Sequence, residues 1–142
     1  MGSKQASFNK QILVVEDHLD SAELLEMVLS DEGYRVKCVY SGTAVLQFFS
    51  PLAVRKRKGS EDFDPDLILL DLRLPDMSGL EVVEGLRKLQ VSYPPIILLS
   101  ADSPKMLDEA IQCIGAKAVR KPFNFDELFS LVKATLEKNA SN

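Results

Sequence analysis

Carboxylate, ammonium and hydroxyl side chains follow four short, strand-like runs in this sequence, at the point where each run ends. The runs lie at 12–15, 67–70, 96–99 and 118–120, and the side chains that follow them belong to Glu16 and Asp17, Asp71, Ser100 and Lys121. Three carboxylates brought within a few ångströms repel one another, so such a cluster either raises its pKa values or captures a cation. With one histidine in the chain, the ligands are oxygens, which favour Mg²⁺ or Ca²⁺ over zinc. A small set of carboxylates that leaves room for water and phosphate suits Mg²⁺ better than Ca²⁺, which takes more oxygen ligands from the protein.

The chemistry that these residues can perform is the transfer of a phosphoryl group to a carboxylate. An aspartate side chain can act as a covalent nucleophile. The transferring group spreads negative charge over its equatorial oxygens, so catalysis consists mainly of positioning and charge neutralisation. Mg²⁺ would neutralise one side of the group, and the ammonium of Lys121 and the hydroxyl of Ser100 would reach its other oxygens.

These side chains meet only if the runs before them lie side by side. Unbroken apolar runs are typical of strands covered on both faces of a parallel sheet. Helical stripes separate the runs, so the chain predicts five strand–helix units, an α/β fold. We expect a flavodoxin-like (βα)5 arrangement, a five-stranded parallel sheet of order 2-1-3-4-5 with helices on both faces. Ligands of such sheets bind at the carboxyl ends of the strands, here between the first and third strands.

Start and stop signals predict the bounds of the helices. Asp20 with Glu23 is typical of a capping box, and Gly33 is placed to end that helix in the left-handed conformation. Asn124 with Glu127 marks the start of the last helix, which runs to about residue 138. The other predicted elements are a strand at 34–39 and helices at 41–49, 80–89 and 105–114, the last ended by Gly115.

Residues 52–66 carry a switch in charge. A basic run at 55–58 is followed by four acidic residues between 61 and 66. Such runs are most often solvated surface, so we expect a loop here, with a docking or localisation patch as the alternative.

The composition is that of one soluble globular domain. The 142 residues are 46% hydrophobic and 27% charged, with a net charge of −4. This weak acidity argues against nucleic acid or an anionic membrane as the main partner, and no apolar run approaches the roughly 20 residues of a membrane span. Cys38 and Cys113 are interpreted as small buried residues of a reduced, cytoplasmic protein. We expect a flexible lead at 1–10, one domain at 11–138 and a tail at 139–142.

Four segments, in this order, resemble those of the response-regulator receiver domains of two-component signalling. They are Val14-Val15-Glu16-Asp17, the stretch from Leu70 to Gly79, Leu99-Ser100-Ala101 and Arg120-Lys121-Pro122-Phe123. The stretch around Asp71 is fairly specific alone, and the four together are very specific. The resemblance covers about residues 11–138, nearly the whole chain.

The resemblance implies an acceptor and a set of metal ligands. Asp71 resembles the aspartate that takes a phosphoryl group from a histidine kinase or a histidine phosphotransfer protein. The phosphorylated state would then change the binding of a downstream effector protein. The implied ligands of Mg²⁺ are Asp17 and Asp71 directly, Glu16 partly through water, and the backbone carbonyl of Arg73.

The resemblance also implies supporting roles around the acceptor. Ser100 matches the hydroxyl that moves toward the phosphoryl group, and Lys121 matches the lysine that bridges this group and the acceptor carboxylate. Pro122 would follow a cis peptide bond, and Gly79 suits a tight loop before the next helix. Such a domain promotes its own phosphorylation and dephosphorylation, so we do not expect an enzyme with a separate substrate.

Two features depart from the family pattern or refine it. Many members carry Tyr or Phe where this chain has Ala118, so the usual aromatic switch is not expected and the route of the signal is open. Arg73 and Asp102 flank the path of the hydrolytic water, and our hypothesis is that they pair and lengthen the lifetime of the acyl phosphate.

The sequence ends after the last helix, as expected of a stand-alone regulator, a phosphorelay shuttle or a fragment of a longer protein.

Other classes of protein remain as alternatives. A pseudo-receiver that acts only as a protein-binding module usually lacks one acidic residue or the lysine, and both are present here. A phosphatase with an aspartyl nucleophile needs a second acid two residues later, a position held by Arg73. A flavin-binding protein would need a phosphate-binding loop where Glu16 and Asp17 stand.

Overall fold

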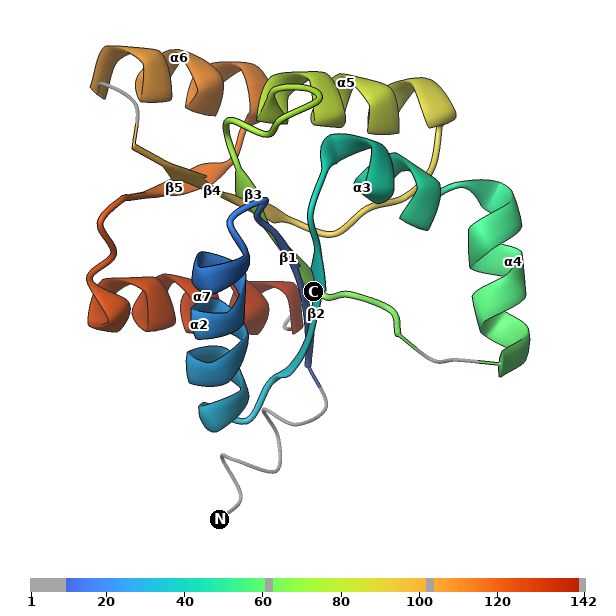
Figure 1. Ribbon diagram of the computed structural model, residues 1–142, viewed down its shortest axis with the longest axis horizontal. Helices are drawn as coiled ribbons and strands as arrows, with labels where there is room; N and C mark the ends of the chain where they lie inside the picture. Colours follow the sequence, from blue (N-terminus) through green and yellow to red (C-terminus); the bar gives the residue numbers. More distant parts are fainter. Residues whose placement is uncertain (1–9, 61–62, 102–103, 141–142) are drawn as a thin grey trace.

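Five strands form one parallel sheet at the centre of the molecule (Figure 1). The computed structural model describes residues 10–60, 63–101 and 104–140. The strands are β1 (Gln11–Val15), β2 (Arg35–Val39), β3 (Leu67–Asp71), β4 (Ile96–Ser100) and β5 (Lys117–Arg120). Neighbouring strands are parallel and follow the order β2-β1-β3-β4-β5, which confirms the predicted topology.

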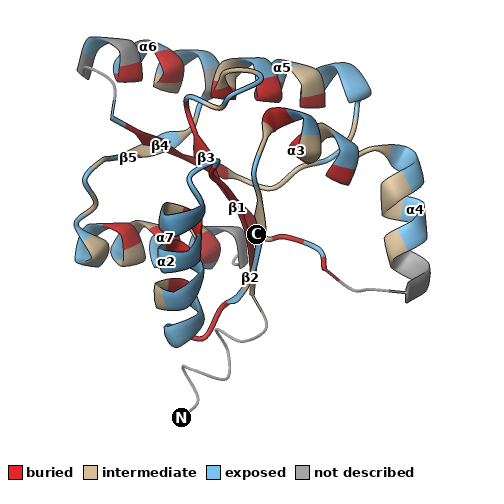
Figure 2. Cartoon of the chain, viewed as in Figure 1, coloured by how far each residue is buried: buried red, intermediate tan, exposed pale blue. Residues whose placement is uncertain are grey.

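Helices cover both faces of this sheet (Figure 1). One face packs against α2 (Leu19–Asp31) and α7 (Phe125–Ala140), and the other against α3 (Gly42–Phe48), α5 (Gly79–Leu89) and α6 (Pro104–Ile114). Every residue of β3 and β4 is buried, whereas the edge strands β2 and β5 are partly exposed (Figure 2). Burial on both faces explains why the central strands are continuous apolar runs without alternating polar residues.

The helix ends follow most of the predicted signals. Gly33 and Gly115 adopt positive φ angles of 99° and 74° after α2 and α6, as expected for left-handed helix ends. The side chain of Asn124 accepts a hydrogen bond of 3.1 Å from the backbone of Glu127, which confirms the predicted cap of α7. The capping box predicted at Asp20 is wrong: α2 begins one residue earlier, and Asp20 lies in its first turn. A carboxylate there favours the helix through its charge and not through a capping bond.

The prediction of a loop at 52–66 is wrong for most of that segment. A helix, α4, spans Pro51–Ser60 and is a second helix in the connection between β2 and β3. The hydroxyl of Ser50 accepts a hydrogen bond of 3.3 Å from the amide of Ala53 and so caps the first turn. Proline suits the first position of a helix, and arginine and lysine are good helix formers. The basic run at 55–58 is typical of a solvated loop and outweighed these helix signals in the prediction.

Helix α4 is attached to the core through an arginine. The guanidinium of Arg57 lies 3.6 Å from the ring centroid of Phe48, at the end of α3, and donates a hydrogen bond to the carbonyl of the same residue. The ring of Phe48 in turn makes edge contacts with Phe49 and Phe63. A basic residue in the middle of the run therefore has a structural role.

A loop that leads away from β3 is tied to the start of α3 by one carboxylate. The side chain of Asp76 accepts hydrogen bonds from the amides of Gly42 (2.9 Å) and Thr43 (2.8 Å) and from the Thr43 hydroxyl. Gly42 is buried against Met77 of the same loop, where an added Cβ would come within 2.2 Å of the methionine Cγ. The loop after Asp71 is thus held against α3.

The two cysteines differ in burial. Cys38 is half-buried and burial raises the pKa of its thiol to about 11. Cys113 is exposed, so the prediction that both are buried is wrong for this residue, which lies on an outward face of α6. Within the described parts of the chain, no helix has the length and apolar character needed to cross a membrane.

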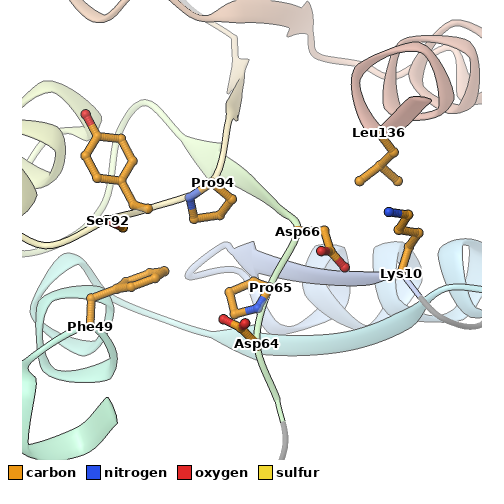
Figure 3. Close-up of a pocket in the computed structure, with 9 residues that line it drawn as sticks. Lys10, Phe49, Asp64, Pro65, Asp66, Ser92, Pro94 and Leu136 are labelled. Atoms are coloured by element: carbon orange, nitrogen blue, oxygen red, sulfur yellow. The ribbon is translucent and has the colours of Figure 1, made fainter. Parts of the chain in front are cut away.

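An open pocket lies at the amino ends of the strands (Figure 3). The carboxylate of Asp66, which lines it, accepts a hydrogen bond of 2.8 Å from the amide of Gln11. The amide of Asp64 donates a hydrogen bond of 3.2 Å to Oε1 of Gln11. These side chains organise the start of β1 and β3, and the pocket lies at the edge opposite the predicted site.

Replacement of Arg57 by alanine is expected to lower the free energy of unfolding by about 1 kcal/mol, because a cation–π contact and a hydrogen bond are lost. The matched control is Arg55→Ala in the same helix, where the side chain is exposed. Urea unfolding of both variants measures the difference. Equal losses would contradict the attachment of α4 through Arg57.

Acid should release the loop from α3. The bonds from Thr43, then that from Gly42, lower the pKa of Asp76 from 3.8 to about 2. A depressed pKa contributes stability that is present above 3.8 and lost as pH falls through about 2. We expect the unfolding free energy to fall less steeply with acid in Asp76→Asn than in the wild type, as followed by urea unfolding at each pH.

A matched pair at Thr43 provides the control for this linkage. Thr43→Val removes the hydroxyl donor and should flatten the acid dependence in part, whereas Thr43→Ser retains it. Identical acid dependence in Asp76→Asn and the wild type would show that this carboxylate does not hold the loop.

Candidate functional site

The polar residues predicted to meet lie at one edge of the sheet. Strand pairing aligns Val15 with Leu70, Asp71 with Leu99, and Ser100 with Arg120. Glu16, Asp71, Ser100 and Lys121 therefore reach the same edge, at the carboxyl ends of β1, β3, β4 and β5. Their convergence is set by the parallel register and not by proximity in the sequence.

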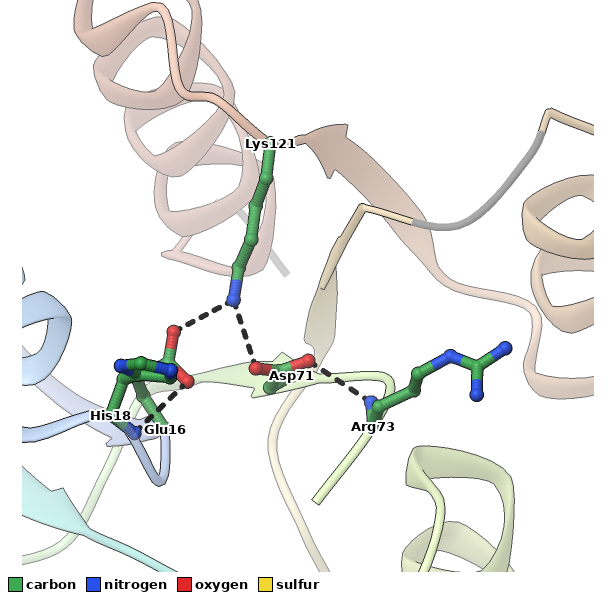
Figure 4. Close-up of polar contacts among 5 residues, drawn as sticks. All are labelled: Glu16, His18, Asp71, Arg73 and Lys121. Carbon is green, nitrogen blue, oxygen red and sulfur yellow. Dashed lines mark hydrogen bonds and ion pairs between the residues drawn. The ribbon is translucent and has the colours of Figure 1, made fainter. Parts of the chain in front are cut away.

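The ammonium of Lys121 bridges two carboxylates at this edge (Figure 4). Its Nζ atom lies 2.8 Å from Oε1 of Glu16 and 2.9 Å from Oδ2 of Asp71. Glu16 is completely buried and Asp71 is 6% exposed. Buried carboxylates are stable only when they are paired and hydrogen-bonded, and the lysine provides both.

The electrostatics of this group are not balanced by the lysine alone. Burial, and next the neighbouring Asp71, raise the pKa of Glu16 above 4.5 against the opposing effect of Lys121. Burial by itself favours the neutral amine of Lys121, but hydrogen bonds and charges from Glu16 and Asp71 outweigh it and raise the lysine pKa above 10.5. Both shifts are consistent with an excess of negative charge.

Three carboxylates at this edge could hold a metal ion. Glu16, Asp17 and Asp71 each offer an oxygen, and these oxygens lie within 4.8 Å of one another. Asp17 is exposed while the other two are buried, so the group opens to solvent on one side. A set of carboxylate oxygens that leaves positions for water fits Mg²⁺, which keeps part of its hydration shell in proteins.

The loop after β3 orients the Asp71 side chain. The amide of Arg73 donates a hydrogen bond of 3.0 Å to Oδ1 of Asp71, and the Arg73 guanidinium points away from this carboxylate (Figure 4). The amide of Gly79 closes the loop by donating a hydrogen bond of 2.7 Å to the carbonyl of Leu72. An added Cβ at Gly79 would lie 3.2 Å from the Leu72 Cα, so the close approach explains the glycine.

Ser100 and Pro122 lie where the sequence predicts them. Ser100 is 1% exposed at the end of β4, and its carbonyl accepts a hydrogen bond of 2.8 Å from the Lys121 amide. The peptide bond between Lys121 and Pro122 is cis, which confirms that expectation. The role of the Ser100 hydroxyl stays a prediction.

Some predicted features are not tested by this geometry. Metal binding through the carbonyl of Arg73 stays a prediction, and Asp102, its predicted partner, lies outside the described residues. Ala118 is half-buried on the face of the sheet that packs against α5 and α6. His18 is exposed at the N-terminal boundary of α2, and its amide lies 3.5 Å from Oε2 of Glu16.

Two contacts at or near the site could not be predicted from the sequence. The bond between Lys121 and Glu16 joins residues 105 positions apart, and the clamp between Asp76 and Gly42 spans 34 positions. Topology brings the first pair to one edge but does not say which carboxylate the lysine contacts. For the second pair, an aspartate in a loop carries no local signal of its distant partner.

Comparisons with known proteins agree with this geometry. The profile of the response regulator receiver domain matches residues 12–133. The uncharacterized transcriptional regulatory protein YkoG of Bacillus subtilis (strain 168) is 33% identical over 130 residues, which are 92% of this chain and 52% of that protein. The chain spans between a quarter and about half of the length of the curated relatives that it matches.

Solved structures of receiver domains are also similar. The signal receiver domain of a putative LuxO repressor protein from Vibrio parahaemolyticus is 31% identical, with a TM-score of 0.73 over 91% of each chain. The receiver domain of the histidine kinase CKI1 from Arabidopsis thaliana, in complex with Mg²⁺ and BeF3⁻, is 25% identical with a TM-score of 0.76, over 96% of this chain and 95% of that one. With its sheet order, its acidic edge and the match over residues 12–133, this chain belongs to the response regulator receiver domain family.

Proposed function

We propose that Asp71 accepts a phosphoryl group at a Mg²⁺-dependent site formed by the carboxyl ends of β1, β3, β4 and β5. The observation that carries this proposal is the contact of 2.9 Å between Lys121 Nζ and Asp71 Oδ2 beside the oxygen group of Glu16, Asp17 and Asp71. A cation on one side of the acceptor and a cation-binding cluster on the other can neutralise a phosphoryl group from both sides.

The chain's own residues account for the chemical step. An Oδ atom of Asp71 forms a bond to phosphorus while the bond from phosphorus to the donor atom breaks, and the donor leaves with that electron pair. The amide of Arg73 holds the other carboxylate oxygen at 3.0 Å and so fixes the orientation of the nucleophile. When bound, Mg²⁺ neutralises charge on the phosphoryl oxygens.

Lys121 responds to the new charge. Before transfer its ammonium is shared between Glu16 and Asp71. After transfer, the phosphoryl oxygens of the acyl phosphate carry more negative charge than the carboxyl group of Asp71, so the ammonium shifts toward them. Ser100, at the end of β4, provides the hydroxyl that approaches the same oxygens. A change in these positions is how the site would signal its state to the surface.

A single-turnover acceptor fits this site better than the other classes. A pseudo-receiver usually lacks one acidic residue or the lysine, whereas three carboxylates and Lys121 all reach this edge. A phosphatase would need an acid where Arg73 stands, and that side chain points away from Asp71 (Figure 4). We therefore propose a signalling acceptor and not an enzyme with a separate substrate.

The chemistry also indicates the classes of partner. We propose a histidine kinase or a histidine phosphotransfer protein as the donor, and an effector protein that binds the phosphorylated state. The CKI1 receiver domain, which was solved with Mg²⁺ and BeF3⁻, supports the choice of metal and acceptor by analogy. We place this exchange in the cytoplasm, because both cysteines are free thiols as expected for a reducing compartment.

Phosphorylation of Asp71 should be observable by mass spectrometry. Incubation with Mg²⁺ and acetyl phosphate is expected to add roughly 80 Da, the mass of one phosphoryl group, as an acid-stable and base-labile acyl phosphate. Asp71→Asn should show no adduct, because an amide oxygen is a poor nucleophile. Asp31→Asn, at the distant end of α2, is the matched control and should retain it. An adduct that persists in Asp71→Asn would contradict the proposed acceptor.

Binding of Mg²⁺ should stabilise the folded state. At a concentration about 100 times its dissociation constant, Mg²⁺ is expected to add about 2.7 kcal/mol to the free energy of unfolding, measured by thermal or urea unfolding. The effect arises because Mg²⁺ binds the folded state, where three carboxylates lie together, and not the unfolded chain. Asp17→Asn should remove most of the stabilisation.

The control for metal binding lies three residues along the chain. Asp20 is an exposed carboxylate outside the group of oxygens, so the response of Asp20→Asn to Mg²⁺ should equal that of the wild type. The same response in Asp17→Asn would place the metal elsewhere.

A further inference from the structure

Helix α4 presents an outward face that the phosphoacceptor site does not use. Leu52, Arg55 and Lys56 stand at positions i, i+3 and i+4, so they share one side of the helix. All three are exposed, and 62% of the Leu52 surface is accessible. The other side is half-buried toward α3 and carries Ala53, Val54 and Arg57.

Positive charge is concentrated in this helix. Four basic residues occupy 55–58, and the segment from Pro51 to Ser60 contains no acidic residue. The whole chain has 17 basic and 21 acidic residues, so 13 against 21 remain outside α4, a net charge of −8. The helix stands apart from the sheet, beyond α3 (Figure 1). A cationic and partly apolar surface therefore projects from an acidic domain.

Helix α2 carries the opposite pattern on its outer face. An open hollow on this face is lined by Asp20, Glu23, Leu24, Glu26, Met27 and Ser30. Leu24 is 42% exposed and Met27 is 57% exposed. The hollow thus combines apolar side chains with three carboxylates. An apolar side chain flanked by cations, as on α4, is complementary to it in both polarity and charge.

We propose that α4 of one copy of this chain packs on the outer face of α2 of a second copy, with Leu52 against Leu24 and Met27 and with Arg55 and Lys56 near Glu23 and Glu26. The apolar contact would remove exposed hydrophobic surface from water. The charges would orient the two helices and disfavour the pairing of α4 with α4 or of α2 with α2.

A second copy fits the α4 face better than a nucleic acid does. Phosphate groups pair with cations but offer nothing to Leu52, and the net charge of −8 outside α4 repels a polyanion. The acidic hollow on α2 matches the apolar side chain as well as the cations. An acidic helix of another protein would be an alternative occupant, and the absence of self-association would favour it.

The arrangement of the two helices allows the contact to close on itself. Helix α2 packs on one face of the sheet beside the edge strand β2, and α4 lies on the side of α3, which covers the other face. A twofold axis parallel to β2 would exchange the faces and bring each α4 toward the α2 of the other copy. The assembly would then be a dimer and not an open chain. Because both faces are small, the dimer is expected to be weak.

Sedimentation equilibrium of the wild type, in low and in high salt, tests the proposal. We expect a reversible dimer in low salt that dissociates in high salt as the charges are screened. The variant Arg55→Glu/Lys56→Glu should weaken association by about tenfold or more, because two attractive contacts become repulsive. Glu23→Lys/Glu26→Lys should do the same from the other side. These side chains are exposed, so both variants should fold, as circular dichroism can verify.

Mixing the two variants distinguishes direct pairing from a change in net charge. In an equimolar mixture, the acidic α4 of one variant faces the basic α2 of the other, so dimers should form again. The control Arg87→Glu/Lys88→Glu reverses two exposed cations of α5 and should leave association unchanged. A monomeric wild type at all concentrations, larger assemblies than a dimer, or a mixture that stays monomeric would overturn the proposal.

Discussion

Buried negative charge at the carboxyl edge of the sheet is the constraint on which the rest of the site depends. Glu16 has no solvent contact and Asp71 has little, yet both reach the same point, where one ammonium serves the two carboxylates. Either carboxylate would be costly to bury alone. The raised pKa of Glu16 shows that the lysine does not fully offset burial and mutual repulsion. The site therefore carries an excess of negative charge, which is the condition under which a divalent cation would bind here.

Strand register and loop contacts hold the residues of this edge in place. The register of β1, β3 and β4 fixes the position of each polar side chain, because a slip of one strand would move the polar residue at its end away from this edge. The loop after Asp71 is held by the glycine contact at 79 and by the clamp from Asp76 to α3. A change of charge at Asp71 thus acts on a loop with two firm attachments. Ala118 stands where many receiver domains carry an aromatic residue. Among the described residues, the hydrogen bonds to Asp76 connect the acceptor loop to the surface at α3.

The sequence contained enough information to predict the sheet and the edge at which the site lies. Continuous apolar runs that end in Glu16, Asp71 and Ser100 predict parallel strands, and five strand–helix units of this size favour the order that the structure shows. Helix α4 does not follow from the sequence, because a run of four cations is typical of a solvated loop, although Ser50 caps the helix. The clamp at Asp76 could not be predicted because its partners are distant in the sequence and are brought near only by packing.

The most direct test of the account is a crystal structure of this chain grown with Mg²⁺ and beryllium fluoride, a mimic of the phosphoryl group. We expect beryllium bonded to an Oδ atom of Asp71, Mg²⁺ in contact with Asp17 and Asp71, and Lys121 Nζ moved from Glu16 to a fluorine atom. A structure in which Asp71 carries no beryllium, or in which Lys121 still joins Glu16 to an occupied Asp71, would contradict it.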